Sequence, residues 1–182
     1  MPRSYWVETL GCPKNQVDSD KLEGTLLADG LTVAAGPEDA DLIVVNTCAF
    51  IEEARQESID TILALDDRRR AGARLVVTGC MAERYGGELA EALPEVDLVA
   101  PFGVALTAVG SPSAGVPVRI GSKPAAPVVP AFDLLNLPRP PARGPWAYVK
   151  VAEGCDRNCG FCAIPSFRGK QRSRSKIGRA HV

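Results

Sequence analysis

The chain has 182 residues, of which 46% are hydrophobic and 24% charged, with a formal net charge of −1 at pH 7. No apolar run approaches the roughly 18 residues that a membrane span requires, and the start lacks the basic-then-apolar pattern of a secretion signal. We therefore expect a globular protein of the cytoplasm. Because thiols stay reduced there, the six cysteines favour metal binding or catalysis over disulfides.

The charge is distributed unevenly along the chain. Residues 146–182 hold eight Lys and Arg against two acids, a balance of +6, whereas residues 1–145 hold thirteen against twenty, a balance of −7. Two domains with different surfaces explain such a split. An acidic front part is a poor electrostatic partner for nucleic acid, so we expect no direct nucleic-acid binding by this chain.

Several apolar and β-branched segments in the first hundred residues are typical of strands. The segments "DLIVVN" and "RLVVTG" are apolar throughout, as expected of strands that are buried on both faces of a parallel sheet. The expected strands cover residues 4–10, 31–35, 41–46, 74–79 and 96–100.

Helical periodicity fills the intervals between these strands. Asn15 is an expected N-cap, with Asp18 three residues later, and Gly30 an expected C′ residue. Further helices are expected over 51–65 and 82–93. Strands that alternate with helices predict an α/β fold with a parallel, doubly wound sheet in residues 1–101.

Three isolated cysteines, Cys12, Cys48 and Cys80, each follow one of the expected strands. All strands of a parallel sheet end at the same edge, which is where ligands bind in such folds. We therefore expect the three thiols to converge on a shared ligand. The alternative is three unconnected buried thiols, since free cysteine is a common core residue.

The second part of the chain differs in composition. Residues 101–145 contain ten of the fifteen prolines, which predicts a linker over 102–145. After it, "WAYVKVAEGC" is expected to form a strand that leads into a loop rich in cysteine. The sequence assigns no role to Lys150 or Glu153. Arg168, Lys170, Arg172 and Arg174 are expected either to serve the substrate or to be surface charge.

That loop carries Cys155, Cys159 and Cys162 in the spacing Cys-x-x-x-Cys-x-x-Cys. A structural zinc site takes four protein ligands, as does a ferredoxin-type cluster. Three thiolates leave one iron of a [4Fe–4S] cluster without a protein ligand and therefore open to a substrate or cofactor. The spacing, with Phe161 before the last cysteine, resembles the radical S-adenosylmethionine (SAM) superfamily, in which SAM chelates that iron. A zinc-binding or redox module is the alternative.

Four segments resemble the methylthiotransferase family of radical SAM enzymes. They are "LGCPKNQVDSD", "VVNTCAFIEEARQESID", "VVTGCMAERYGGEL" and "AYVKVAEGCDRNCGFCAIPSFRGKQRSR". In that family, three cysteines of the N-terminal domain bind a second [4Fe–4S] cluster, and by their motifs these match Cys12, Cys48 and Cys80.

Two branches of the family compete. Residues 11–15 (GCPKN), residues 47–51 (TCAFI) and the segment "IPSFRG" resemble the RimO type, which modifies an aspartate of small-subunit ribosomal protein twelve. The alternative is the MiaB type, which modifies adenosine in tRNA. An acidic front domain suits a basic protein substrate.

The resemblance implies a mechanism, cofactors and partners. Electron transfer from the cluster at Cys155, Cys159 and Cys162 cleaves SAM, and the resulting radical removes a hydrogen from the β-carbon of the aspartate. Sulfur from the second cluster then joins that carbon, and a second SAM supplies the methyl group. The implied cofactors are two [4Fe–4S] clusters and SAM, and the implied electron donor is a flavodoxin or ferredoxin. No side chain other than the cluster ligands is assigned to catalysis.

The resemblance also sets expectations for the end of the sequence. Family members continue through a barrel and a small β-barrel domain, so residues 146–176 are expected to be the truncated start of a radical SAM domain. Residues 177–182 (IGRAHV) are expected to be a non-native tail, which excludes His181 as a ligand. We expect this chain by itself to be inactive.

Overall fold

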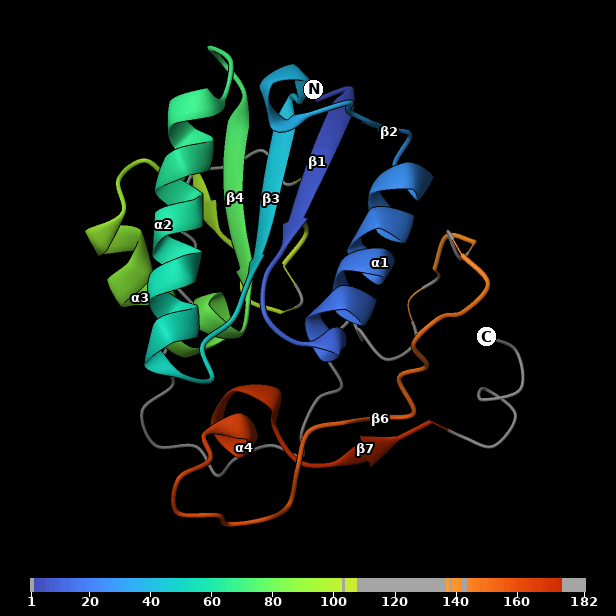
Figure 1. The fold of residues 1–182 in the computed structure, drawn as a ribbon, viewed down its shortest axis with the longest axis vertical. Coiled ribbons are helices and arrows are strands. Elements are labelled where there is room, and N and C mark those ends of the chain that lie inside the picture. The colour runs from blue at the N-terminus through green and yellow to red at the C-terminus, as the bar shows by residue number, and fades with distance from the viewer. Residues whose placement is uncertain (1, 103, 108–136, 138, 142–143, 175–182) are drawn as a thin grey trace, which may run out of the picture.

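The computed structural model describes residues 2–102, 104–107, 137, 139–141 and 144–174. Its main feature is a five-stranded sheet in the order β2-β1-β3-β4-β5, and every neighbouring pair is parallel (Figure 1). This confirms the expected α/β fold. The strands are β1 (Ser4–Thr9), β2 (Thr32–Val33), β3 (Leu42–Thr47), β4 (Arg74–Gly79) and β5 (Leu98–Val99).

Helices cover both faces of the sheet. Helix α1 (Pro13–Ala28) packs its Leu22 and Leu26 against one face, in a cluster with Leu42, Val44 and Val76. Helices α2 (Glu52–Arg68) and α3 (Cys80–Ala92) cover the other face, and a short 3-10 helix spans Pro37–Asp39. Strand β3 is buried at all six positions because it has a strand on each side and helices above and below. Within the described residues, no helix is both long enough and apolar enough to cross a lipid bilayer.

The first helix begins two residues before the expected cap. Cys12 occupies the N-cap position and Pro13 the first turn, where a missing N–H costs no hydrogen bond. Asn15 was expected to cap the helix, and this prediction is wrong. Its side-chain amide instead donates to the carbonyls of Leu10 (2.8 Å) and Thr47 (3.0 Å). Gly30 follows the end of the helix, as predicted.

The third helix also begins early, directly at Cys80 rather than at residue 82, and it contains a non-helical residue at Tyr85. Strand β4 therefore passes into α3 without a loop. The thiol of Cys80 is consequently placed by two rigid elements and not by a flexible turn.

The C-terminal part has little regular structure. A strand over 146–155 was expected, but only β6 (Ala152–Glu153) forms, paired antiparallel with β7 (Arg172–Ser173). Among the described residues, β6 pairs with β7 alone, and one further hydrogen bond joins the Arg174 amide to the Val151 carbonyl. Helix α4 (Ile164–Arg168) lies between the two strands in sequence. Most of the expected linker and the whole tail, including His181, lie outside the described residues. The domain boundaries and the barrel assignment therefore remain predictions.

Candidate functional site

The three isolated cysteines lie at the carboxyl ends of neighbouring strands. Cys12 is three residues past β1, while Cys48 and Cys80 directly follow β3 and β4. Because the sheet order runs β1-β3-β4, the three strand ends are side by side. Cys12 is exposed, whereas Cys48 and Cys80 are each only 7% exposed.

The loops that carry these cysteines are packed against one another. A Cβ atom at Gly11 would lie 2.7 Å from the Cβ of Cys48 and 2.8 Å from its Sγ, so only glycine allows this approach. The Asn15 bonds described above tie the first turn of α1 to the ends of β1 and β3. Contacts within the protein alone therefore pack the loops at the carboxyl edge of the sheet closely together.

The segment with the second cysteine triplet lies across this same edge. Figure 1 shows α4, β6 and β7 below the strand ends, which point toward them. The contact is centred on Arg168, which is 8% exposed. Its Nη1 donates to Asp18 Oδ2 (2.6 Å) and to the carboxylate of Glu153 (3.3 and 3.4 Å). Its Nη2 donates to Asn15 Oδ1 (2.9 Å) and to Cys80 Sγ (3.0 Å).

Further ion pairs surround Arg168. Lys150 pairs with both Asp18 and Glu153, and the side chains of all three are almost fully buried. Lys14, which is partly exposed, pairs with Glu153 at 3.1 Å. Two carboxylates thus neutralise two buried cations at the interface. Removing any one of these four charged side chains would leave a net buried charge.

Burial and neighbouring charges shift the pKa values of Glu153, Cys80 and Lys21. Burial by itself would raise the pKa of Glu153, but Arg168 and Lys150 outweigh it and lower the pKa to about 2. Burial raises the pKa of the Cys80 thiol, and Arg168 opposes that rise. Burial, followed by the positive charge of Lys150, lowers the pKa of Lys21 to about 8.

The loop of the second triplet is anchored at its base and open at its tip. The Cys155 amide donates to the Gly169 carbonyl (3.0 Å), and the Gln171 amide donates to Asp156 Oδ1 (2.9 Å). Cys155 and Cys162 are partly buried and Cys159 is exposed. Phe161 is 89% exposed, so the aromatic residue of the motif contributes nothing to the packing.

Neither triplet forms a closed ligand set in the part of the chain that the structure describes. No three Cys, His, Asp or Glu side chains there lie close enough together to hold a metal ion. Coordination of a [4Fe–4S] cluster by Cys12, Cys48 and Cys80, or by Cys155, Cys159 and Cys162, therefore stays a prediction. The donor chemistry fits such a group, because each segment offers three thiols and the front one also has a cation at a thiol.

The structure corrects the expectation for Arg168 and places two residues that the sequence left without a role. Arg168 was expected to serve the substrate or to be surface charge, and no role was assigned to Lys150 or Glu153. All three side chains instead lie in the buried interface. One signal in the sequence pointed there: Asp18 lies one helical turn before Leu22, so it shares the inner face of α1 and requires a buried partner.

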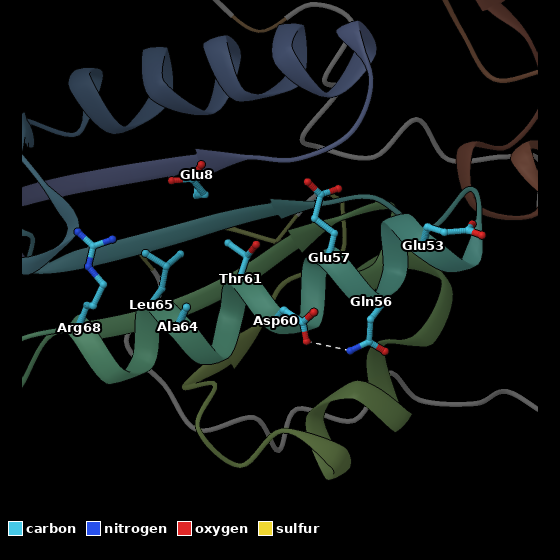
Figure 2. Close-up of a pocket in the computed structure, with 9 residues that line it drawn as sticks. All are labelled: Glu8, Glu53, Gln56, Glu57, Asp60, Thr61, Ala64, Leu65 and Arg68. Atoms are coloured by element: carbon cyan, nitrogen blue, oxygen red, sulfur yellow. Dashed lines mark hydrogen bonds between the residues drawn. The ribbon is translucent and has the colours of Figure 1, made fainter.

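An open groove of about 670 Å³ runs along α2 (Figure 2). Glu53 lies at one end and Arg68 at the other, and Glu8 of β1 faces the helix. Four of the nine lining residues are acidic and one is basic, so the groove carries a net negative charge. The groove is lined by Glu8, Glu53, Gln56, Glu57, Asp60, Thr61, Ala64, Leu65 and Arg68.

The chain is similar to known proteins along most of its length. A protein named ribosomal protein uS12 methylthiotransferase RimO from Myxococcus xanthus is 43% identical over 185 residues, which cover 95% of this chain and 36% of the relative. The proteins of the same name from Desulfosudis oleivorans and Kineococcus radiotolerans are 46% and 42% identical, and the matches cover 91% and 94% of this chain. The chain spans 36–42% of the length of these three curated relatives.

These similarities confirm the predicted resemblance to RimO-type methylthiotransferases. Residues 4–101, which hold the whole five-stranded sheet, match the family described as "Uncharacterized protein family UPF0004". Since that match covers more than half of the 182 residues, the chain belongs to the UPF0004 family.

Proposed function

We propose that this chain is part of a radical SAM methylthiotransferase that adds a methylthio group to the β-carbon of an aspartate in ribosomal protein uS12. The observation that carries the proposal is the position of the two cysteine segments. The front cysteines follow the carboxyl ends of three adjacent strands, and the segment with the second triplet is joined to that same edge by buried ion pairs. The similarity to RimO proteins over at least 91% of the chain supports the choice of substrate.

In this proposal the two triplets have different tasks. Cys155, Cys159 and Cys162 would hold one [4Fe–4S] cluster and leave one of its irons open to SAM. Cys12, Cys48 and Cys80 would hold a second cluster, which would be the source of the sulfur. When bound, these cofactors supply radical chemistry that acid–base side chains cannot perform on an unactivated C–H bond. The proposed electron donor is a flavodoxin or ferredoxin of the cytoplasm.

The protein's own residues supply burial, charge and alignment. Cys48 and Cys80 are withdrawn from water, which protects a bound cluster. The acidic groove along α2 and the charge of −7 in residues 1–145 suit a basic protein substrate better than tRNA. These features favour the RimO-type reaction over the MiaB-type reaction.

The test is mass spectrometry of uS12 from a strain that lacks the gene, before and after return of the full-length gene. We expect methylthio-aspartate to disappear in the deletion strain and to return with the intact gene, but not with a Cys80→Ala version. If only a methylthio group on tRNA adenosine disappears, the substrate assignment is wrong. Zinc without cluster absorption after anaerobic reconstitution would instead identify a zinc-binding module.

A further inference from the structure

Arg168 contacts both cysteine-bearing parts of the chain. Its Nη2 is 3.0 Å from the sulfur of Cys80, at the end of β4. The next residue, Gly169, accepts a hydrogen bond of 3.0 Å from the amide of Cys155, the first cysteine of the second triplet. Two successive residues therefore connect Cys80 with Cys155, which are 75 positions apart in the sequence.

The guanidinium group is held from several sides. Its Nη1 bonds to Asp18 and Glu153, and its Nη2 bonds to Asn15 and Cys80. Its carbon atom Cζ lies 4.9 Å from the centre of the Phe102 ring. A planar fork with five donors makes these contacts at the same time, whereas a lysine ammonium is a single point charge and does not. The geometry is therefore specific to arginine.

The charges around Arg168 are balanced within the interface. Asp18 and Glu153 neutralise the two buried cations, Lys150 and Arg168, while the partly exposed Lys14 also pairs with Glu153. Among these cations, Arg168 is the one with a hydrogen bond to a sulfur. Metal-bound cysteine is a thiolate, so a positive group beside the Cys80 sulfur suits a ligand.

We infer that Arg168 is a positioning residue that fixes the Cys80 sulfur relative to the loop of Cys155, Cys159 and Cys162. The inference rests on the proposed function, since it assigns Arg168 to the arrangement of the two cluster sites. The contacts of Arg168 are with protein side chains, so no catalytic role is assigned to it. It sets how the two sites face each other and donates a hydrogen bond to one ligand sulfur.

Hydrogen exchange of the metal-free chain tests the docking. In the parent chain the amides of Cys155 and Arg174 are bonded to Gly169 and Val151. We expect Arg168→Gln to speed exchange across 150–174 by about tenfold or more, because a single charged hydrogen bond has that effect on an equilibrium. Strand β3 should keep its protection. Arg168→Lys should lie between Arg168→Gln and the parent.

Lys170→Gln is the matched control. It also removes one positive charge from the same segment, two residues away, but its side chain is exposed. It should exchange like the parent. Parent-like protection in Arg168→Gln would overturn the inference.

A second measurement separates positioning from general stability. In a chain with Cys155, Cys159 and Cys162 replaced by Ala, the front site is reconstituted with iron and sulfide and its reduction potential is measured. A hydrogen bond to a ligand sulfur raises the potential of an iron–sulfur cluster. We expect Arg168→Gln to shift the potential to more negative values, with Arg168→Lys closer to the parent and Lys170→Gln unchanged.

An unchanged potential in Arg168→Gln would overturn the contact with the ligand sulfur while leaving the proposed function intact. If the front site takes up no iron in the chain that keeps Arg168, the proposed cluster at Cys12, Cys48 and Cys80 is wrong, and with it the proposed function. The exchange experiment then decides by itself whether Arg168 holds the two segments together.

Discussion

The two cysteine triplets are held in place by different kinds of structure. The front triplet follows hydrogen-bonded strands whose positions are set by a core buried on both faces. The second triplet lies in a loop between the two-residue strand β6 and the five-residue helix α4, and buried ion pairs attach this part to the front domain. The first site therefore depends on packing and the second on charge, so different changes should disrupt them.

The largest expected effect is on the sheet that carries the front triplet. Gly79 has φ of +93°, and a Cβ atom there would lie 2.3 Å from Asn46 Oδ1 and 2.6 Å from the carbonyl oxygen of Thr47. Gly79→Ala combines an unfavourable backbone angle with overpacking, so we expect a loss of about 3 kcal/mol or more in the free energy of unfolding. Urea denaturation followed by circular dichroism measures it.

The control for this substitution is Gly87→Ala within α3, where an added Cβ meets nothing within 4 Å. Alanine is the better helix former, so Gly87→Ala should stabilise by about 0.5–1 kcal/mol. If the two alanine variants have equal stability, the packing account of the front edge is wrong.

Iron retention should also differ between the two triplets. One variant has Cys12, Cys48 and Cys80 replaced by Ala, and the other has Cys155, Cys159 and Cys162 replaced. After anaerobic reconstitution and exposure to air, we expect the second variant to retain more iron, because Cys48 and Cys80 are buried and Cys159 is exposed. Iron counting over time provides the comparison. Longer retention of iron by the variant that lacks Cys12, Cys48 and Cys80 would contradict this expectation.

A glycine in the second region should have a local effect. Gly154 has φ of +76°, and a Cβ atom there would lie 2.2 Å from the carbonyl oxygen of Lys170. Gly154→Ala should therefore open the β6–β7 pair and speed amide exchange in 150–174. The main unfolding transition should shift by less than half of the Gly79→Ala effect. A loss as large as that of Gly79→Ala would show that the two regions unfold as one unit.

Acid should release the second region before the sheet unfolds. The pKa of Glu153 is about 2 in the folded chain against an ordinary value of 4.5, so the unfolded carboxyl binds protons more readily. The stabilisation, on the order of 3 kcal/mol at most, is present above pH 4.5 and is lost as the pH falls toward 2. NMR of the Cys155 and Arg174 amides should show this loss, with amides of β3 as the internal reference.

Glu153→Gln has no carboxyl group to titrate at this position. Its docking should be weaker at neutral pH and should change less with pH between 4.5 and 2 than that of the parent, in which both Glu153 and Asp18 are carboxylates of the interface. A parent chain whose docking is constant over that interval would contradict the assignment of Glu153 to the interface.

Sequence patterns by themselves determined the elements and the chemistry. Apolar strands, helical periodicity and the Cys-x-x-x-Cys-x-x-Cys spacing are local features, and they predicted the α/β fold and both thiol sets. The start of α1 was misplaced because the side chain of Asn15 bonds to strand ends, one of which, at Thr47, is 32 positions away in the sequence. A local rule for helix caps contains no information about such partners.

Only the tertiary structure decided which strands are neighbours and what Arg168 contacts. Its bond to Asp18 joins residues 150 positions apart, and its bond to Cys80 joins residues 88 positions apart. A charged residue in a short polar segment has the same local pattern whether it is exposed or buried. Its burial depends on whether an opposite charge from elsewhere in the chain is placed beside it, because a buried ion is tolerated only with such a partner.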